Sequence, residues 1–323
     1  MAGGSQGVVF KALAANIGIA IAKFVAAGIS QSSAMLSEAV HSLADSGNQI
    51  FLLMGMRRAV RQEDAIHEFG YAHERYFWAF IVAVSLFTIG ATFSMYEGVH
   101  KILHPHGHMG SGTVAYIVLG VSIALELYSM NAALAEFRHI KAGRTLRQTI
   151  DEARDAVVIV VLFEDAAALV GLLAALGGVL VSHLTGNGIY DGIGSIVVGI
   201  TLFGVAFFLA RKTKGLLIGQ SVPLEQRARM VEIVEQSPGV LQLLHLRTMH
   251  LGPEEVLVGM KIVLDDKRPV GEATQFIDVM EARLRAELPQ LKRIYVEIGA
   301  PEDPKPKMTG SITIPTEIDP EAL

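Results

Sequence analysis

Long apolar runs dominate the first two thirds of the chain and alternate with short polar connections. A helix that crosses a membrane needs about 20 mainly apolar residues. Six runs of that length occur, at residues 8–29, 34–56, 76–102, 113–135, 156–184 and 189–209. We therefore expect an α-helical membrane protein with six transmembrane helices, which together form a domain of residues 1–219.

Basic residues are distributed unevenly between the connections. They flank the second and fourth connections and follow the last run, as Arg57, Arg58, Arg61, Arg75, Lys141, Arg144, Arg147, Arg211, Lys212 and Lys214. The other three connections, "ISQSS", "LHPHGHMGSG" and "SHLTGNG", contain no Lys or Arg. Because Lys and Arg concentrate on the cytoplasmic side, both termini are expected in the cytoplasm. In a bacterium the membrane would be the inner, cell membrane.

The pattern changes after Gly219. An amphipathic helix is predicted at 222–237, two strands at 240–251 and 254–265, a second helix at 271–288 and a last strand at 293–300. This α-β-β-α-β order predicts a small cytoplasmic α+β domain of ferredoxin-like type, residues 220–301, with its helices on one face of a sheet. Residues 302–323 are rich in Pro and charge, so disorder is expected there.

Composition supports a chain that lies largely in lipid. Hydrophobic residues make up 51% of it and charged residues only 18%, with a mean hydropathy of +0.43, whereas a soluble domain carries about 25% charge. The bilayer is therefore an expected partner. The net charge of -5 provides no basic surface for nucleic acid, and the absence of Cys excludes disulfides and thiolate metal sites.

The second apolar run contains a polar face. In "SEAVHSLADSGNQI", Glu38, His41, Asp45 and Asn48 fall within about 80° of one another at about 100° per residue. An ionisable group near the bilayer centre costs roughly 2.5 to 3.5 kcal/mol, so it usually has a function or a partner. His41 and Asp45 are four residues apart, where two side chains can meet at one ion, and an imidazole with a carboxylate suits Zn²⁺.

The fifth run supplies a second acidic group. Glu164 and Asp165 stand between aliphatic residues in "VVLFEDAAALVG", and they would repel each other unless a cation lay between them and the second run. A metal-free cluster for proton relay or helix packing is the alternative. Lys23, Glu126 and Asp191 also lie in or at the edges of apolar runs, where they could pair or shape a proton route.

These features resemble the cation diffusion facilitator family of metal-ion/proton antiporters, and most of all its zinc transporter nine-like branch. The resemblance covers nearly the whole chain through "HSLAD", "HEFGYAHERYFWAF", "SPGV", "HLRT" and "LGP". It implies a homodimeric transporter rather than an enzyme, which moves Zn²⁺ out of the cytoplasm in exchange for protons. An Mn²⁺, Fe²⁺ or Co²⁺ exporter, or a membrane-anchored metal sensor without transport, is the alternative.

The resemblance also implies the ligands. His41 and Asp45 match the pair on the second span, and Asp165 matches the last position of the pair on the fifth. The first position of that pair is Val161, which cannot bind metal. Either Glu164 or Asn48 could supply the fourth ligand.

A second, loop-borne zinc site of the family is incomplete in this chain. Asp64 and His67 match two of its ligands, whereas Tyr71 replaces the third. His73 could substitute for it; otherwise the segment is an ordinary polar loop.

Two further sets of residues bear on metal binding. His104, His106 and His108 alternate in an outside loop, where they either hold metal weakly at the exit or are simply solvated. In the tail domain, Leu244, Met260 and Glu297 stand where family members carry zinc-binding His. A domain that only dimerises is therefore expected, without a regulatory zinc cluster.

Overall fold

The computed structural model describes residues 2–104, 112–141, 145, 148–150, 156–265 and 267–300. They belong to two compact units, Met1–Gly219 and Gln220–Leu323. The predicted disordered segment, 302–323, lies outside the described residues.

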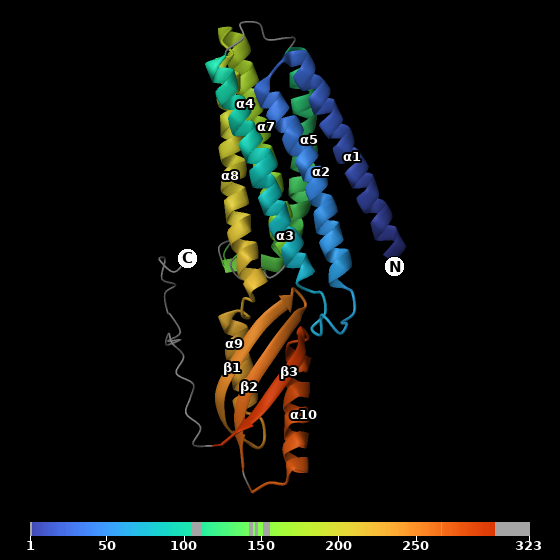
Figure 1. Ribbon diagram of the computed structural model, residues 1–323, viewed down its shortest axis with the longest axis vertical. Coiled ribbons are helices and arrows are strands. Elements are labelled where there is room, and N and C mark those ends of the chain that lie inside the picture. The colour runs from blue at the N-terminus through green and yellow to red at the C-terminus, as the bar shows by residue number, and fades with distance from the viewer. Residues whose placement is uncertain are drawn as a thin grey trace. The chain divides into compact units, whose positions relative to one another are not determined.

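In the described part of the first unit every regular element is a helix (Figure 1). Its elements are α1 (Ala2–Ser30), α2 (Ser33–Ala59), α3 (Glu74–Ser85), the π-helix η1 (Leu86–Ala91), α4 (Thr92–Leu103), α5 (Gly112–Lys141), α7 (Ala156–Thr185) and α8 (Ile189–Ile218). Each of the six predicted apolar runs lies within these helices, and the third run comprises α3, η1 and α4 in succession. The helical class of this domain is confirmed.

Four segments of the described chain are long and apolar enough to cross a membrane, by length and composition. They are Glu74–Leu103, Thr113–Asn131, Ile159–Thr185 and Ile189–Ile218, and α1 adds the shorter apolar segment Asn16–Ser30. The helix α2 is the least apolar of the first unit, since it carries the polar face. The chain is therefore an integral membrane protein, and the number of six spans stays a prediction.

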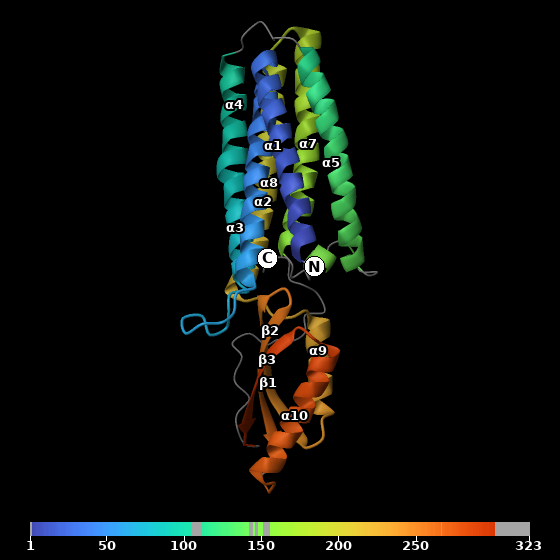
Figure 2. The same cartoon turned by 90° about the vertical axis from the view of Figure 1, so that its right-hand side faces the viewer.

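Four helices form a ring: α1 packs against α2 and α5, and α7 packs against the same two helices. The succession of α3, η1 and α4 lies with α8 on the other side of α2, away from α5 (Figure 2). The helix α2 therefore turns one side to the interior of the ring and another side to α8.

Small residues let α4 and α8 approach closely. A Cβ at Gly98 of α4 would lie 2.7 Å from the carbonyl oxygen of Gly192 on α8, and a Cβ at Gly199 would lie 2.9 Å from the backbone nitrogen of Met95. Glycine at such positions allows helix backbones to pack closely in membranes.

Polar groups of α2 that face α8 have protein partners. Ser32 Oγ donates to Asp191 Oδ1 at 2.5 Å, and the backbone nitrogen of Ser33 donates to Asp191 Oδ2 at 2.7 Å. Farther along, Ser37 shares a hydrogen bond with Ser195. Ser32 Oγ also accepts from the backbone nitrogen of Met35 at 3.0 Å and so caps the start of α2.

The second unit has the predicted α-β-β-α-β order, which is confirmed. Its elements are α9 (Leu224–Glu235), β1 (Val240–Gly252), β2 (Glu255–Leu264), α10 (Val270–Glu287) and β3 (Leu291–Gly299). The sheet order is β1-β2-β3, with β1 antiparallel and β3 parallel to β2, so that Val258 of β2 stands opposite Thr248 and Ile294. Both helices cover one face of the sheet, where Met230 and Met280 are fully buried (Figure 2).

Candidate metal site between the membrane helices

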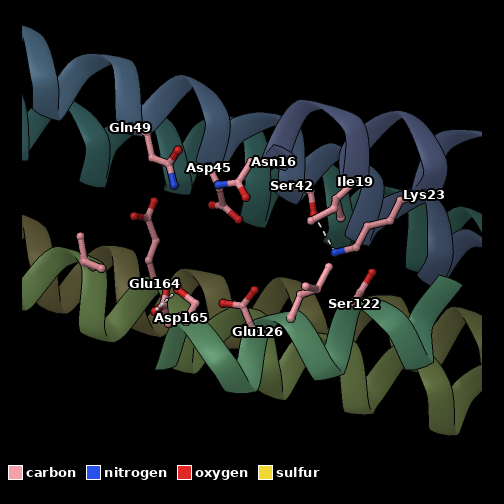
Figure 3. A pocket seen from close by; sticks show the side chains of 13 residues that line it. Asn16, Ile19, Lys23, Ser42, Asp45, Gln49, Ser122, Glu126, Glu164 and Asp165 are labelled. Carbon is pink, nitrogen blue, oxygen red and sulfur yellow. Dashed lines mark hydrogen bonds between the residues drawn. The ribbon is translucent and has the colours of Figure 1, made fainter. Parts of the chain in front are cut away.

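A small polar cavity lies inside the ring of α1, α2, α5 and α7, with a volume of about 120 Å³. Three of its lining residues are aliphatic and the rest are polar: Asn16 and Lys23 of α1, Ser42, Asp45 and Gln49 of α2, Ser122, Glu126 and Ser129 of α5, and Glu164 and Asp165 of α7. In Figure 3 the side chains of α1 and α2 face those of α5 and α7 across this space. When the aliphatic residues Ile19, Leu125 and Val161 are included, lining residues recur three or four positions apart on each helix, the spacing of one helical face.

His41 and Asp45 form a pair on α2. His41 Nδ1 lies 3.4 Å from Asp45 Oδ1, and the His41 side chain is 1% exposed. Neither ring nitrogen of His41 has a hydrogen-bond partner, nor does Asp45 Oδ1. Asp45 lines the cavity, whereas His41 is not among its lining residues. Because buried polar atoms are nearly always paired, these unpartnered atoms mark a place suited to a ligand.

The α7 wall carries the second acidic group. Asn48 Nδ2 donates to Glu164 Oε1 at 2.5 Å, and Ser129 Oγ donates to Asp165 Oδ2 at 2.9 Å. The two alternatives for the fourth ligand, Glu164 and Asn48, are therefore in contact with each other. Val161 lines the same wall.

The predicted ligands share this region without converging on one point. Asp45, Glu164 and Asp165 line one cavity, whereas His41 and Asn48 lie outside its lining. Within the part of the chain that the structure describes, no three His, Asp or Glu side chains are close enough together to hold a metal ion. In this conformation the carboxylates face one another across open space (Figure 3).

Three ionisable residues for which the apolar runs predicted no definite role now have a place. Lys23 and Glu126 line the cavity. Asp191, a residue of α8, accepts hydrogen bonds from the start of α2. The signal that singled them out in the sequence was the same for all three, a charge inside or at the edge of an apolar run. It does not say toward which neighbour each helix face turns.

In the loop before α3, the carboxylate of Asp64 receives its hydrogen bonds from other residues of the same loop. Asp64 Oδ1 accepts from the backbone nitrogens of Ile66 at 3.0 Å and His67 at 2.8 Å, and Asp64 Oδ2 accepts from the Tyr71 hydroxyl at 2.5 Å. These bonds, that of Tyr71 first, lower the pKa of Asp64 to about 2. The His73 ring instead contacts Tyr76, 6.2 Å away between ring centroids.

The remaining residues considered for metal binding are the histidines after α4 and three positions of the second unit. The ring of His104 lies 4.9 Å from that of His100, and His106 and His108 lie outside the described residues. In the second unit, Leu244 and Met260 are buried, and Glu297 Oε1 lies 3.0 Å from Lys261 Nζ.

Comparison with known proteins identifies both parts of the chain. Residues 9–218 match the cation efflux transmembrane domain, and residues 222–299 match the cytoplasmic domain of cation efflux proteins. The chain is 32% identical over 283 residues to the proton-coupled zinc antiporter SLC30A9, mitochondrial, of Mus musculus, covering 86% of this chain and 50% of that protein. It is 33% identical over 253 residues to metal tolerance protein C4 of Arabidopsis thaliana, covering 77% of this chain and 55% of that protein. The chain thus spans about half the length of these relatives.

Proposed function

Since the chain belongs to the cation efflux family, also called cation diffusion facilitators, we propose that it exports a divalent cation, foremost Zn²⁺, from the cytoplasm in exchange for protons. The names of the two relatives, a zinc antiporter and a metal tolerance protein, support this substrate class. The observation that carries the proposal is the polar cavity inside the membrane helices, with carboxylates from α2 and α7 on opposite walls.

The proposed ligands are His41 and Asp45 of α2 and Asp165 of α7, with Glu164 as the fourth. The unpartnered nitrogens of His41 support its role, because a neutral imidazole nitrogen is a good Zn²⁺ ligand. Asn48 then acts behind the ion and orients Glu164 through their hydrogen bond. Binding requires α2 and α7 to close around the ion, since no three of these described side chains come together in this conformation.

Proton exchange follows from the same side chains. Metal ligation requires ionised carboxylates and a neutral imidazole, so a bound ion and bound protons exclude each other. Rocking of the helices would open the cavity alternately to the two sides of the membrane. We further propose that both termini are cytoplasmic and that the protein is a homodimer joined partly through its second unit, the family's cytoplasmic domain.

A harder ion is the second candidate. The cavity lining contains Asp45, Glu126, Glu164 and Asp165 and, among the described residues, no His. Oxygen ligands favour Mn²⁺, and mixed oxygen and nitrogen sites also suit Fe²⁺ and Co²⁺. Calorimetric titration of the wild type and of Asp45→Ala with Zn²⁺, Mn²⁺, Fe²⁺, Co²⁺ and Cd²⁺ would rank these ions. Tightest binding of Mn²⁺, lost in the variant, would replace Zn²⁺ as the proposed substrate.

The proposed function is tested by metal uptake into proteoliposomes under an imposed pH gradient. Asp45→Asn and Asp165→Asn should each lower the rate about 100-fold or more, because loss of even an outer-shell partner of a metal costs about 10- to 100-fold. Asp278→Asn, which removes an exposed carboxylate of α10, is the matched control and should transport at the wild-type rate. Wild-type rates in both cavity variants would refute the ligand assignment. A wild type that binds Zn²⁺ and moves none would favour a membrane-anchored sensor.

A further inference from the structure

Lys23 gives the cavity a positive charge. It lies on α1, its side chain is 4% exposed, and it is the single Lys or Arg among the described residues that line the cavity. The four lining carboxylates would attract a divalent cation, whereas an ammonium group beside them repels it. A buried charge in a membrane helix is costly and is usually retained for a function.

Two acceptors on α2 fix the position of the ammonium group. Lys23 Nζ donates to Ser42 Oγ at 2.6 Å and to Glu38 Oε2 at 3.1 Å. Ser42 lines the cavity and Glu38 does not. The positive end of the ion pair is therefore the one that faces the cavity.

The fold makes room for Glu38 behind this ammonium group. Glu38 is fully buried, and its Oε1 has no hydrogen-bond partner. A Cβ at Gly171 of α7 would collide with Oε1, so glycine at this position admits the carboxylate. Three helices thus meet at the ion pair. A buried ion pair is weak support for stability, because desolvation offsets its attraction, which leaves a functional role as the better explanation.

We propose that Lys23 is a fixed counter-charge, which limits the affinity of the cavity for a divalent cation so that the ion can leave. The inference rests on the proposed function and assigns a residue outside its ligand set. A transport site must bind its ion firmly enough to load it and weakly enough to release it. Lys23 offsets the carboxylates while no metal is bound and opposes the metal once it enters. Glu38 and Ser42 are positioning residues that hold the ammonium group at the wall.

The test is Lys23→Met in the full chain, which removes the charge and keeps an unbranched side chain. Calorimetry with Zn²⁺ on the detergent-solubilised protein should give a Kd lower by on the order of tenfold. In proteoliposomes KM should fall as well, and the turnover at saturating Zn²⁺ should fall because release is slower. Lys101→Met is the matched control. Lys101 is also buried, on α4, where its Nζ donates to the backbone carbonyl of Gln31 at 2.9 Å, away from the cavity, and its variant should keep the wild-type Kd.

A double variant, Lys23→Met with Glu38→Gln, separates this role from a merely structural one. It removes both charges together, so that no buried charge is left unpaired. We expect it to bind Zn²⁺ more tightly than the wild type, though less tightly than Lys23→Met. Weaker binding in Lys23→Met that returns to the wild-type Kd in the double variant would overturn the proposal in favour of a structural pair. Unchanged Kd and turnover in both variants would overturn it too. A wild type that binds no divalent cation would overturn the proposed function along with it.

Discussion

Two His–Asp pairs in this chain have the same contact distance and opposite surroundings. His41 Nδ1 lies 3.4 Å from Asp45 Oδ1 on α2, and His67 Nδ1 lies 3.4 Å from Asp64 Oδ1 in the loop before α3. The His41 side chain is 1% exposed and that of His67 is 49% exposed. Residue type and contact distance thus do not distinguish the two pairs.

Their hydrogen bonds do distinguish them. Asp64 accepts from two backbone nitrogens and from the Tyr71 hydroxyl, so the loop itself supplies the hydrogen bonds that stabilise the ionised carboxylate. Both nitrogens of His41 and one oxygen of Asp45 lack partners although they are buried. In a protein interior an unpartnered lone pair is costly, and it is therefore better evidence of a ligand site than proximity of a His to an Asp.

The largest predicted contrast between the two pairs is in transport. His41→Asn should lower Zn²⁺ uptake into proteoliposomes about 100-fold or more, since it removes a proposed ligand. His67→Asn, the matched change in the loop, should leave uptake at the wild-type rate because Asp64 has other partners. Equal losses in the two variants would refute the contrast and make the loop part of the transport path.

The next prediction concerns the α7 wall and sharpens the choice of the fourth ligand. Glu164→Gln keeps the size of the side chain and removes its charge, so the Kd for Zn²⁺ should rise about 100-fold. Asn48→Ala removes the donor that orients Glu164, and the Kd should rise about tenfold, as expected of a partner behind the ligands. Calorimetry on the purified variants measures both. The opposite order would assign the ligand to Asn48.

Much of this architecture could be predicted from local patterns. The apolar runs predicted the helices, and the alternation after Gly219 predicted the order of the second unit, because both patterns depend on neighbours along the chain. The helical spacing of Glu38, His41, Asp45 and Asn48 likewise predicted one polar face of α2.

The partners of that face could not be predicted, because they depend on how each helix is rotated against the others. Asp45 turns to the cavity, whereas Glu38 pairs with Lys23 of α1. His41 is not among the residues that line the cavity, although it is four residues from Asp45. The place of Glu126 across the cavity depends on the packing of α5 against α1 and α7, which no local pattern contains.

The smallest predicted effect concerns the hydrogen bond that Tyr71 donates to Asp64 in the loop. Tyr71 contributes most to lowering the pKa of Asp64 to about 2, so Tyr71→Phe should raise that pKa toward the ordinary value of about 3.9. The ionised carboxylate stabilises the loop above its unfolded pKa, and this contribution is lost as the pH falls through the folded pKa. In the variant the window between the folded and the unfolded pKa should therefore narrow, so that the contribution is smaller and its loss is complete at a higher pH than about 2. A titration of ¹³C-labelled Asp carboxyls by NMR measures the pKa. Tyr96→Phe, which changes an exposed tyrosine of α4, is the control.

An unchanged pKa for Asp64 would contradict the hydrogen-bond explanation. A fall in Zn²⁺ uptake in Tyr71→Phe would show that the loop and the cavity do not act separately.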